Sequence, residues 1–179
     1  ANDPLHAEAA MESVTRLEEL GYTVLLIPGN HDYGTGSMGN PELVPVFRER
    51  FYGNRDILFP KLDIIDGVAF IGLDSTAEEL SWHDRILSEG ELGNAQLGRL
   101  KKLLDSGSVD GLKKVVYMHH HPFDFKLGRH LRDSEELRKV IEYRADMLLF
   151  GHYHRNKATV GRIFHGKWGI RRCYNAGSS

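Results

Sequence analysis

The histidines of this chain are grouped in a way that could support chemistry. There are 10 of them in 179 residues, and six fall in three short clusters, at His31, at His119–His121 and at His152 with His154. A neutral imidazole is a common metal ligand, and near neutral pH it can also donate or accept a proton. Histidines on an ordinary surface would be scattered instead. The three clusters are therefore the candidates for a functional site.

The last cluster, Gly151-His152-Tyr153-His154, places two histidines one residue apart. On an extended segment alternate side chains point the same way, so both imidazoles can face one pocket. Gly151 leaves room for a close approach of the backbone. Taken alone, a His-x-His pair is more often simply part of a turn.

Three consecutive histidines follow residues 114–118, which are predicted to be a buried strand. If the extension continues, His119 and His121 share one face, and Pro122 fixes the backbone just after them. The alternative is a solvated histidine run. The buried strand before the run argues against exposure of all three side chains.

The first cluster, Gly29-Asn30-His31-Asp32, follows a predicted strand at 23–27. Its residue types are common in turns, so as a turn alone it is unremarkable. The carboxamide oxygen of Asn30 can nevertheless ligate a divalent cation without adding charge. His31 beside it could donate a proton or hold a phosphate oxygen.

Apolar spacing predicts helices and strands that alternate along the chain. The predicted helices are 4–20, 41–51, 95–104 and 134–143, the last capped by Ser134, and the predicted strands are 23–27, 62–66, 68–73, 114–118, 145–150, 158–163 and 168–176. The strands on either side of Asp66-Gly67 are predicted to form a hairpin. Alternating strands and helices favour parallel pairing, and ligands bind where the carboxyl ends of parallel strands share an edge. The three clusters, each after a predicted strand, are therefore expected to converge.

Composition narrows the class of protein. The formal net charge is −2, with 41% hydrophobic and 27% charged residues, which is typical of a single globular domain. Such a chain lacks the basic field of a nonspecific nucleic-acid or anionic-membrane binder, and its longest apolar runs are too short to span a bilayer. The lone cysteine, Cys173, excludes an internal disulfide and is expected to be a packed thiol. It also favours a reducing compartment, so we expect the protein in the cytoplasm.

The three clusters together resemble a known family. Gly29–Asp32 (GNHD), Met118–Phe123 (MHHHPF) and Gly151–His154 (GHYH) are similar, in order, to three of the five signature blocks of the calcineurin-like metallophosphoesterase superfamily. The nearest similarity is to its cyclic-nucleotide and glycerophosphodiester phosphodiesterase-like branch. The other two blocks, Asp-x-His and Gly-Asp-x-x-Asp, would precede the helix that begins near Pro4. We therefore expect residues 1–179 to be a single domain of this family that lacks its first strands.

The resemblance implies an α/β fold in which two mixed sheets pack as a sandwich flanked by helices. The predicted elements alone would equally allow a single doubly wound sheet. The resemblance also implies a centre with two divalent metal ions, and mixed nitrogen and oxygen ligands suit Mn, Fe or Zn. By the family's pattern, one metal takes Asn30, His119 and His152, and the other takes His154.

One ligand depends on how the histidine run is aligned with the family's block. An alignment from Met118 gives His119 as the ligand, and an alignment by Pro122 would give His120 instead. We prefer His119, because Met118 and Phe123 then both match.

The activity implied by the resemblance is metal-dependent hydrolysis of a small-molecule phosphomonoester or phosphodiester. A hydroxide bridging the two metals would attack phosphorus. His31 would protonate the leaving oxygen or stabilise the charge on the phosphoryl group. His120 and Arg129 are candidate substrate contacts, although Arg129, like His130, could equally belong to a solvated basic loop.

The alternative function is a catalytically inactive metallophosphoesterase-like scaffold that binds a protein partner. The sequence upstream of Ala1 separates the two, because Asp-x-His and Gly-Asp-x-x-Asp blocks there would support the enzyme. A purely structural zinc site fits poorly, because such sites are closed and rich in cysteine.

Overall fold

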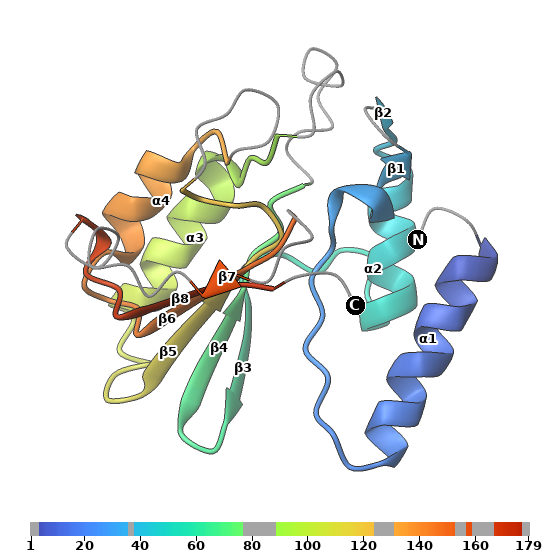
Figure 1. The fold of residues 1–179 in the computed structure, drawn as a ribbon, viewed down its shortest axis with the longest axis horizontal. Helices are drawn as coiled ribbons and strands as arrows, with labels where there is room; N and C mark the ends of the chain where they lie inside the picture. The colour runs from blue at the N-terminus through green and yellow to red at the C-terminus, as the bar shows by residue number, and fades with distance from the viewer. Residues whose placement is uncertain are drawn as a thin grey trace.

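The computed structural model contains a mixed sheet flanked by helices, which confirms the predicted α/β class (Figure 1). It describes residues 4–35, 38–76, 89–123, 131–152, 157–158 and 167–176. The helices bounded within these ranges are α1 (Pro4–Glu19), the short 3₁₀ helix η1 (Asn30–Asp32), α2 (Leu43–Tyr52), α3 (Gly93–Asp105) and α4 (Ser134–Ile141). No helix in the described ranges has the length and apolar character that a membrane crossing requires.

Six strands form one sheet in the order β3-β4-β5-β6-β8-β7. Their bounds are β3 (Lys61–Ile65), β4 (Val68–Gly72), β5 (Lys113–Tyr117), β6 (Met147–Phe150), β7 (Lys157–Ala158) and β8 (Arg172–Asn175). The four inner strands pair in parallel, as predicted, and β3 and β7 are antiparallel edges. The short strands β1 (Gly34–Thr35) and β2 (Met38–Gly39) form a separate ribbon. This is the one large sheet within the described ranges, so the second sheet of the implied sandwich stays a prediction.

The predicted hairpin between β3 and β4 is confirmed. Asp66 and Gly67 have φ angles of 48° and 76°, and a two-residue turn of type I′ requires this left-handed conformation at both positions. Asp and Gly adopt it more readily than most residues. The turn sets Ile65 opposite Val68, so β4 enters the parallel part of the sheet in a fixed register.

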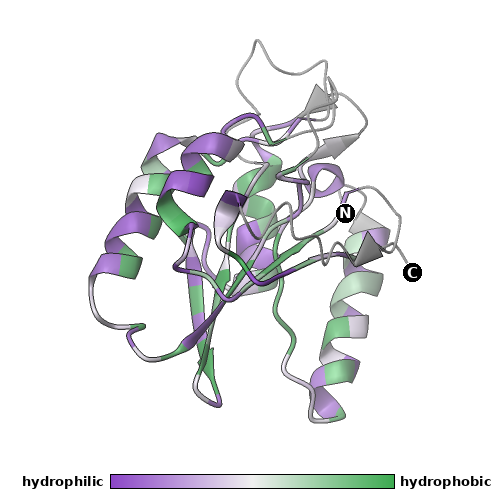
Figure 2. Ribbon diagram, turned by 60° about the vertical axis from the view of Figure 1, so that its left-hand side comes forward, coloured by the Kyte–Doolittle hydropathy of each residue, from purple (hydrophilic) through white to green (hydrophobic). Residues whose placement is uncertain are grey.

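Helices α3 and α4 pack side by side against one face of the sheet (Figure 1). Along both helices hydrophobic residues alternate with hydrophilic ones, as expected for helices with one buried face (Figure 2). The buried cluster contains, among others, Leu97, Leu100 and Leu104 from α3, Leu137 and Ile141 from α4, and Ile71, Val116, Leu148 and Cys173 from the strands. Cys173 is a buried free thiol, as predicted, and burial raises its pKa to about 11.

The strand predicted at 23–27 is not formed by the described residues. Residues 22–29 join α1 to η1 as a single segment, and no described strand pairs with it (Figure 1). The segment is held from the side, where the Tyr52 hydroxyl of α2 donates a hydrogen bond to the Leu26 carbonyl at 3.0 Å. An apolar, β-branched run favours a strand, but a strand also needs a partner to satisfy its backbone groups. Here the described chain supplies none.

The N-terminus of α3 is capped by a residue that is distant in sequence. The Asp133 carboxylate accepts hydrogen bonds from the amides of Leu92 and Gly93, at 3.0 and 2.8 Å. We predicted Ser134 as the cap of α4, but Asp133 occupies that N-cap and makes no side-chain cap bond to α4. Its carboxylate serves α3 instead, because the N-cap of α3 is Leu92, which has no polar side chain.

Asp133→Ala should lower the free energy of unfolding by about 1–2 kcal/mol, because two partly buried amides of α3 lose their acceptor. Burial raises the pKa of the Asp133 carboxyl. A carboxyl whose pKa is raised in the folded protein contributes less to stability as the pH rises through that pKa. The destabilisation caused by Asp133→Ala should therefore be larger near pH 4 than near pH 7. Urea unfolding at both pH values measures this. Asp110→Ala, at an exposed position, is the matched control, and an equal loss there would contradict the capping role.

Candidate metal centre

Loops from three parts of the chain meet at the carboxyl edge of the sheet. The histidine run follows β5 and His152 follows β6, and the two strands are paired with Tyr117 opposite Leu149. The amide of Gly151 then donates a hydrogen bond to the His119 carbonyl at 2.9 Å, which couples the two loops directly. The third loop is η1, which holds Asn30.

Three of the four predicted metal ligands lie together. His119 Nε2 is 2.8 Å from Asn30 Oδ1 and 3.2 Å from His152 Nδ1. These residues are 89 and 33 positions apart in the sequence, so the fold and not local geometry brings them into contact. His154 lies outside the described residues. The role of all four as ligands stays a prediction.

Gly29 permits the close approach of His119. A Cβ at position 29 would lie 3.0 Å from His119 Nδ1, closer than side chains ordinarily pack. Asp32 closes the same turn, because its carboxylate accepts a hydrogen bond from the Gly29 amide at 2.8 Å while its own amide donates to the Gly29 carbonyl at 2.9 Å. From the sequence alone, Asp32 is identified only as a residue type that is common in turns. Its contacts show that it holds the loop that presents Asn30.

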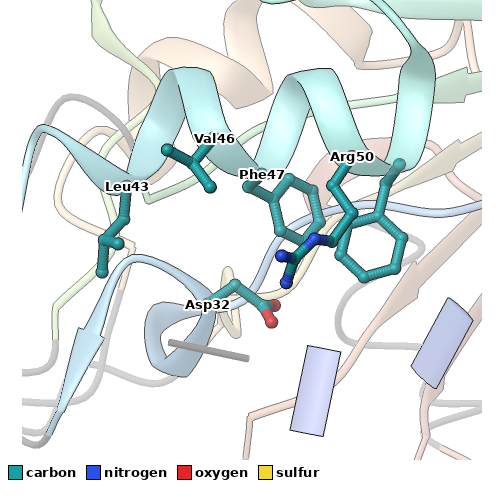
Figure 3. Close-up of a pocket in the computed structure, with 6 residues that line it drawn as sticks. Asp32, Leu43, Val46, Phe47 and Arg50 are labelled. Atoms are coloured by element: carbon teal, nitrogen blue, oxygen red, sulfur yellow. The ribbon is translucent and has the colours of Figure 1, made fainter. Parts of the chain in front are cut away.

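Asp32 also faces α2. Its side chain is directed toward Arg50 across a cavity of about 10 Å³, room for about one water molecule (Figure 3). The remaining lining is apolar and comes from Leu43, Val46, Phe47 and Phe51. The turn that carries Asn30 thus lies against α2 as well as at the edge of the sheet.

His120 lies beneath the site with no exposed surface. Its Nδ1 is 2.9 Å from Ser75 Oγ, and its backbone amide donates to the same oxygen at 3.2 Å. Burial, and then the neighbouring His119 and His152, hold the pKa of His120 well below its usual range, so the ring is neutral near pH 7. We predicted His120 as a substrate contact, and that stays a prediction for a side chain that is buried here.

The imidazoles of His119, His120 and His152 form one cluster, with their ligand nitrogens within 4.8 Å of one another. Within this cluster His119 is hydrogen-bonded to Asn30, and its choice over His120 as the ligand stays a prediction. His31 is exposed on η1, directly after Asn30. Arg129 and His130 lie outside the described residues.

The donor set fits a divalent metal ion. Neutral imidazole nitrogens together with a carboxamide oxygen suit Mn, Fe or Zn better than thiolate-preferring or purely oxygen-preferring metals. Within the described residues no carboxylate joins the histidine group, so the donors of this group are neutral.

Comparison with known proteins identifies the family. The family model for calcineurin-like phosphoesterases matches residues 6–156, which include all three loops of the site. The chain belongs to the calcineurin-like phosphoesterase family. Membership of this family indicates metal-dependent hydrolysis of phosphoesters, in agreement with the histidine cluster. Among curated proteins no significant match is found.

Asn30→Ala and His152→Ala should each weaken the binding of Mn²⁺ and Zn²⁺ by at least about tenfold, or about 1.4 kcal/mol, because each removes a ligand. Isothermal titration calorimetry of the phosphoesterase measures this. His6→Ala changes an exposed histidine of α1 and should leave the affinity unchanged. If all three variants kept the wild-type affinity, the metal would be bound elsewhere.

Proposed function

We propose that the protein is a hydrolase of phosphomonoesters or phosphodiesters that uses two divalent metal ions, and that it belongs to the cyclic-nucleotide and glycerophosphodiester phosphodiesterase-like branch. The observation that carries the proposal is the contact of Asn30, His119 and His152, which come from three separate loops. His119 lies at hydrogen-bonding distance from both Asn30 and His152, and this proximity supports their assignment to one metal. Family membership supports phosphorus as the reacting centre.

The proposal gives each donor a place. Asn30, His119 and His152 hold one metal, and His154 contributes to the second, together with ligands from the Asp-x-His and Gly-Asp-x-x-Asp blocks of the family. When bound, the metals would supply a water of lowered pKa as nucleophile and neutralise charge on the phosphoryl oxygens. Burial, and then the neighbouring His119 and His152, keep the pKa of His120 low, so the imidazole packed against these two rings adds no positive charge near pH 7.

His31 is proposed as the residue that protonates the leaving oxygen or stabilises charge on the phosphoryl group. It directly follows Asn30 on η1, yet it is exposed where Asn30 is half-buried. A side chain at this place can reach a substrate that sits on the solvent side of the metals. The turn that carries both residues is held by Asp32, so the distance between ligand and proton donor is constrained.

An activity panel tests the proposed function. The full-length protein should hydrolyse bis-p-nitrophenyl phosphate or p-nitrophenyl phosphate when Mn²⁺ or Zn²⁺ is present, and a chelator should abolish turnover. Preference for the first substrate would place the activity on diesters, and preference for the second on monoesters. Tight metal binding with no turnover of either substrate would favour the inactive scaffold.

His31→Ala should keep the metal affinity of the wild type and lower kcat by about 100-fold or more, the usual effect of losing a proton donor. The expected reason is that His31 acts in the transition state and does not ligate. Metal titrations and steady-state kinetics on the same preparation separate the two effects. A variant that loses metal before it loses turnover would make His31 a ligand, against this assignment.

A further inference from the structure

The end of β4 carries a short polar segment to which the sequence patterns assign no function. After Leu73 come Asp74, Ser75 and Thr76, and these three residues are 1%, 0% and 2% exposed. Because β4 pairs in parallel with β5, this segment lies at the same edge of the sheet as the histidine run. Buried polar side chains need partners, and the partners of Asp74 and Ser75 lie on the loops of the candidate metal centre.

Ser75 holds His120 at two points. Its hydroxyl oxygen accepts a hydrogen bond from the His120 amide and is bonded to Nδ1 of the imidazole. On the opposite side the ring packs against Gly90, where a Cβ would lie 2.3 Å from His120 Cγ. The Glu91 amide donates a hydrogen bond to the Ser75 carbonyl at 3.1 Å, which joins the segment that contains Gly90 to the segment that contains Ser75. The ring of His120 is therefore fixed in both position and orientation.

His120 in turn supports the two imidazoles that are candidate ligands. Its ring centroid is 5.0 Å from that of His119 and 4.8 Å from that of His152. The ring of His120 is therefore packed against both imidazoles. The orientation of a ligating imidazole strongly affects metal affinity, and supporting contacts of this kind are commonly worth 10- to 100-fold in binding.

Asp74 holds the other loop. Its carboxylate accepts a hydrogen bond from the Tyr33 hydroxyl at 2.9 Å and pairs with the Arg48 guanidinium at 3.3 Å. Tyr33 directly follows η1 and is fully buried. Burial and the Asp74 charge raise the pKa of Tyr33, so the hydroxyl stays protonated and donates. The contact anchors the C-terminal end of the turn that presents Asn30.

The backbone of Asp74 is fixed as firmly as its side chain. Gln96 of α3 accepts a hydrogen bond from the Asp74 amide at 2.9 Å and donates one to the Asp74 carbonyl at 2.7 Å. The Thr76 amide donates to the carboxylate at 3.0 Å. The Asp74-Ser75 pair is thus hydrogen-bonded to α3 through Gln96, and it also contacts the loop of Tyr33 and the loop of His120.

We propose that Asp74 and Ser75 form a positioning element for the metal centre, in which Asp74 acts through Tyr33 on the loop of Asn30 and Ser75 acts through His120 on His119 and His152. This inference rests on the proposed metal-dependent function. Asp74 and Ser75 would not bind the metal themselves but would hold the loops that carry the proposed ligands. Two adjacent residues of one strand end thereby set the distance between two loops that are far apart in the sequence.

The test compares Ser75→Ala with two matched variants of the full-length protein. Ser75→Thr keeps the hydroxyl, and Thr76→Val removes a neighbouring buried hydroxyl for which no hydrogen-bond partner is found among the described residues. Ser75→Ala should bind Mn²⁺ and Zn²⁺ about tenfold more weakly than wild type, at the low end of the usual range for supporting residues. Ser75→Thr should restore most of the affinity, and Thr76→Val should retain it.

Imidazole ¹⁵N spectra of the metal-free protein give a readout that a merely structural role would not move. Ser75→Ala should shift the resonances of His119 and His152 as well as that of His120, whereas Thr76→Val should leave them in place. Tyr33→Phe tests the Asp74 contact independently and should also lower metal affinity while the protein remains folded.

The inference is overturned if Ser75→Ala keeps both the wild-type affinity and the wild-type spectra of His119 and His152. It is also overturned if Thr76→Val lowers the metal affinity as much as Ser75→Ala does, because the effect would then come from a general loss of packing. Failure of the proposed function looks different. A wild-type protein that binds metal without hydrolysing phosphoesters refutes the activity, while the comparison of Ser75 variants still decides the positioning role.

Discussion

Backbone pairing between β5 and β6 continues past the ends of the strands, and the candidate metal centre depends on it. The Met118 amide donates to the Leu149 carbonyl at 3.0 Å, and the Gly151 amide donates to the His119 carbonyl at 2.9 Å. The loop after β5 and the loop after β6 are therefore hydrogen-bonded to each other where they leave the sheet. Because side chains alternate along a strand, a shift of register by one residue would turn His119 to the other face of the sheet. Every contact of the site described above presupposes this register.

A change from an apolar to a polar interior occurs within one residue of the end of β4. Leu73 belongs to the hydrophobic cluster under α3 and α4, while Asp74 and Ser75 begin the buried polar network of the site. A buried carboxylate is costly without compensation, and Asp74 has Arg48 and the Tyr33 hydroxyl as partners. In an interior of low dielectric such a network favours one arrangement over others once its groups are satisfied. The apolar cluster stabilises the fold, and the polar network selects the geometry at the sheet edge.

Local patterns in the sequence predicted the parts of the structure that local forces decide. Helical apolar spacing located α3, and the Asp66-Gly67 pair located the hairpin, because both signals act over a few residues. The predictions failed where a partner far away in the sequence decides the outcome. Asp133 caps α3 from 40 positions away, and Ser75 meets His120 across 45 positions. The type and position of a serine in a polar run do not indicate such a contact, so the sequence alone could locate the loops of the candidate site but not the residues that hold them.

The charge of the described site limits how it can act. Asn30 is uncharged and an imidazole must be neutral to bind a metal, so the three proposed ligands Asn30, His119 and His152 would not balance a divalent cation. Two acidic side chains of the framework that supports the site have structural roles, since Asp32 closes the turn on Gly29 and Asp74 is paired with Tyr33 and Arg48. Compensating negative charge must therefore come from residues outside the described part of the chain or from the ligand itself. A phosphoester carries such charge on its non-bridging oxygens, and in the proposed centre it would add to the charge of the Asp ligands from the family's other blocks. Uncharged donors on the described loops are therefore consistent with the anionic phosphoester proposed as substrate.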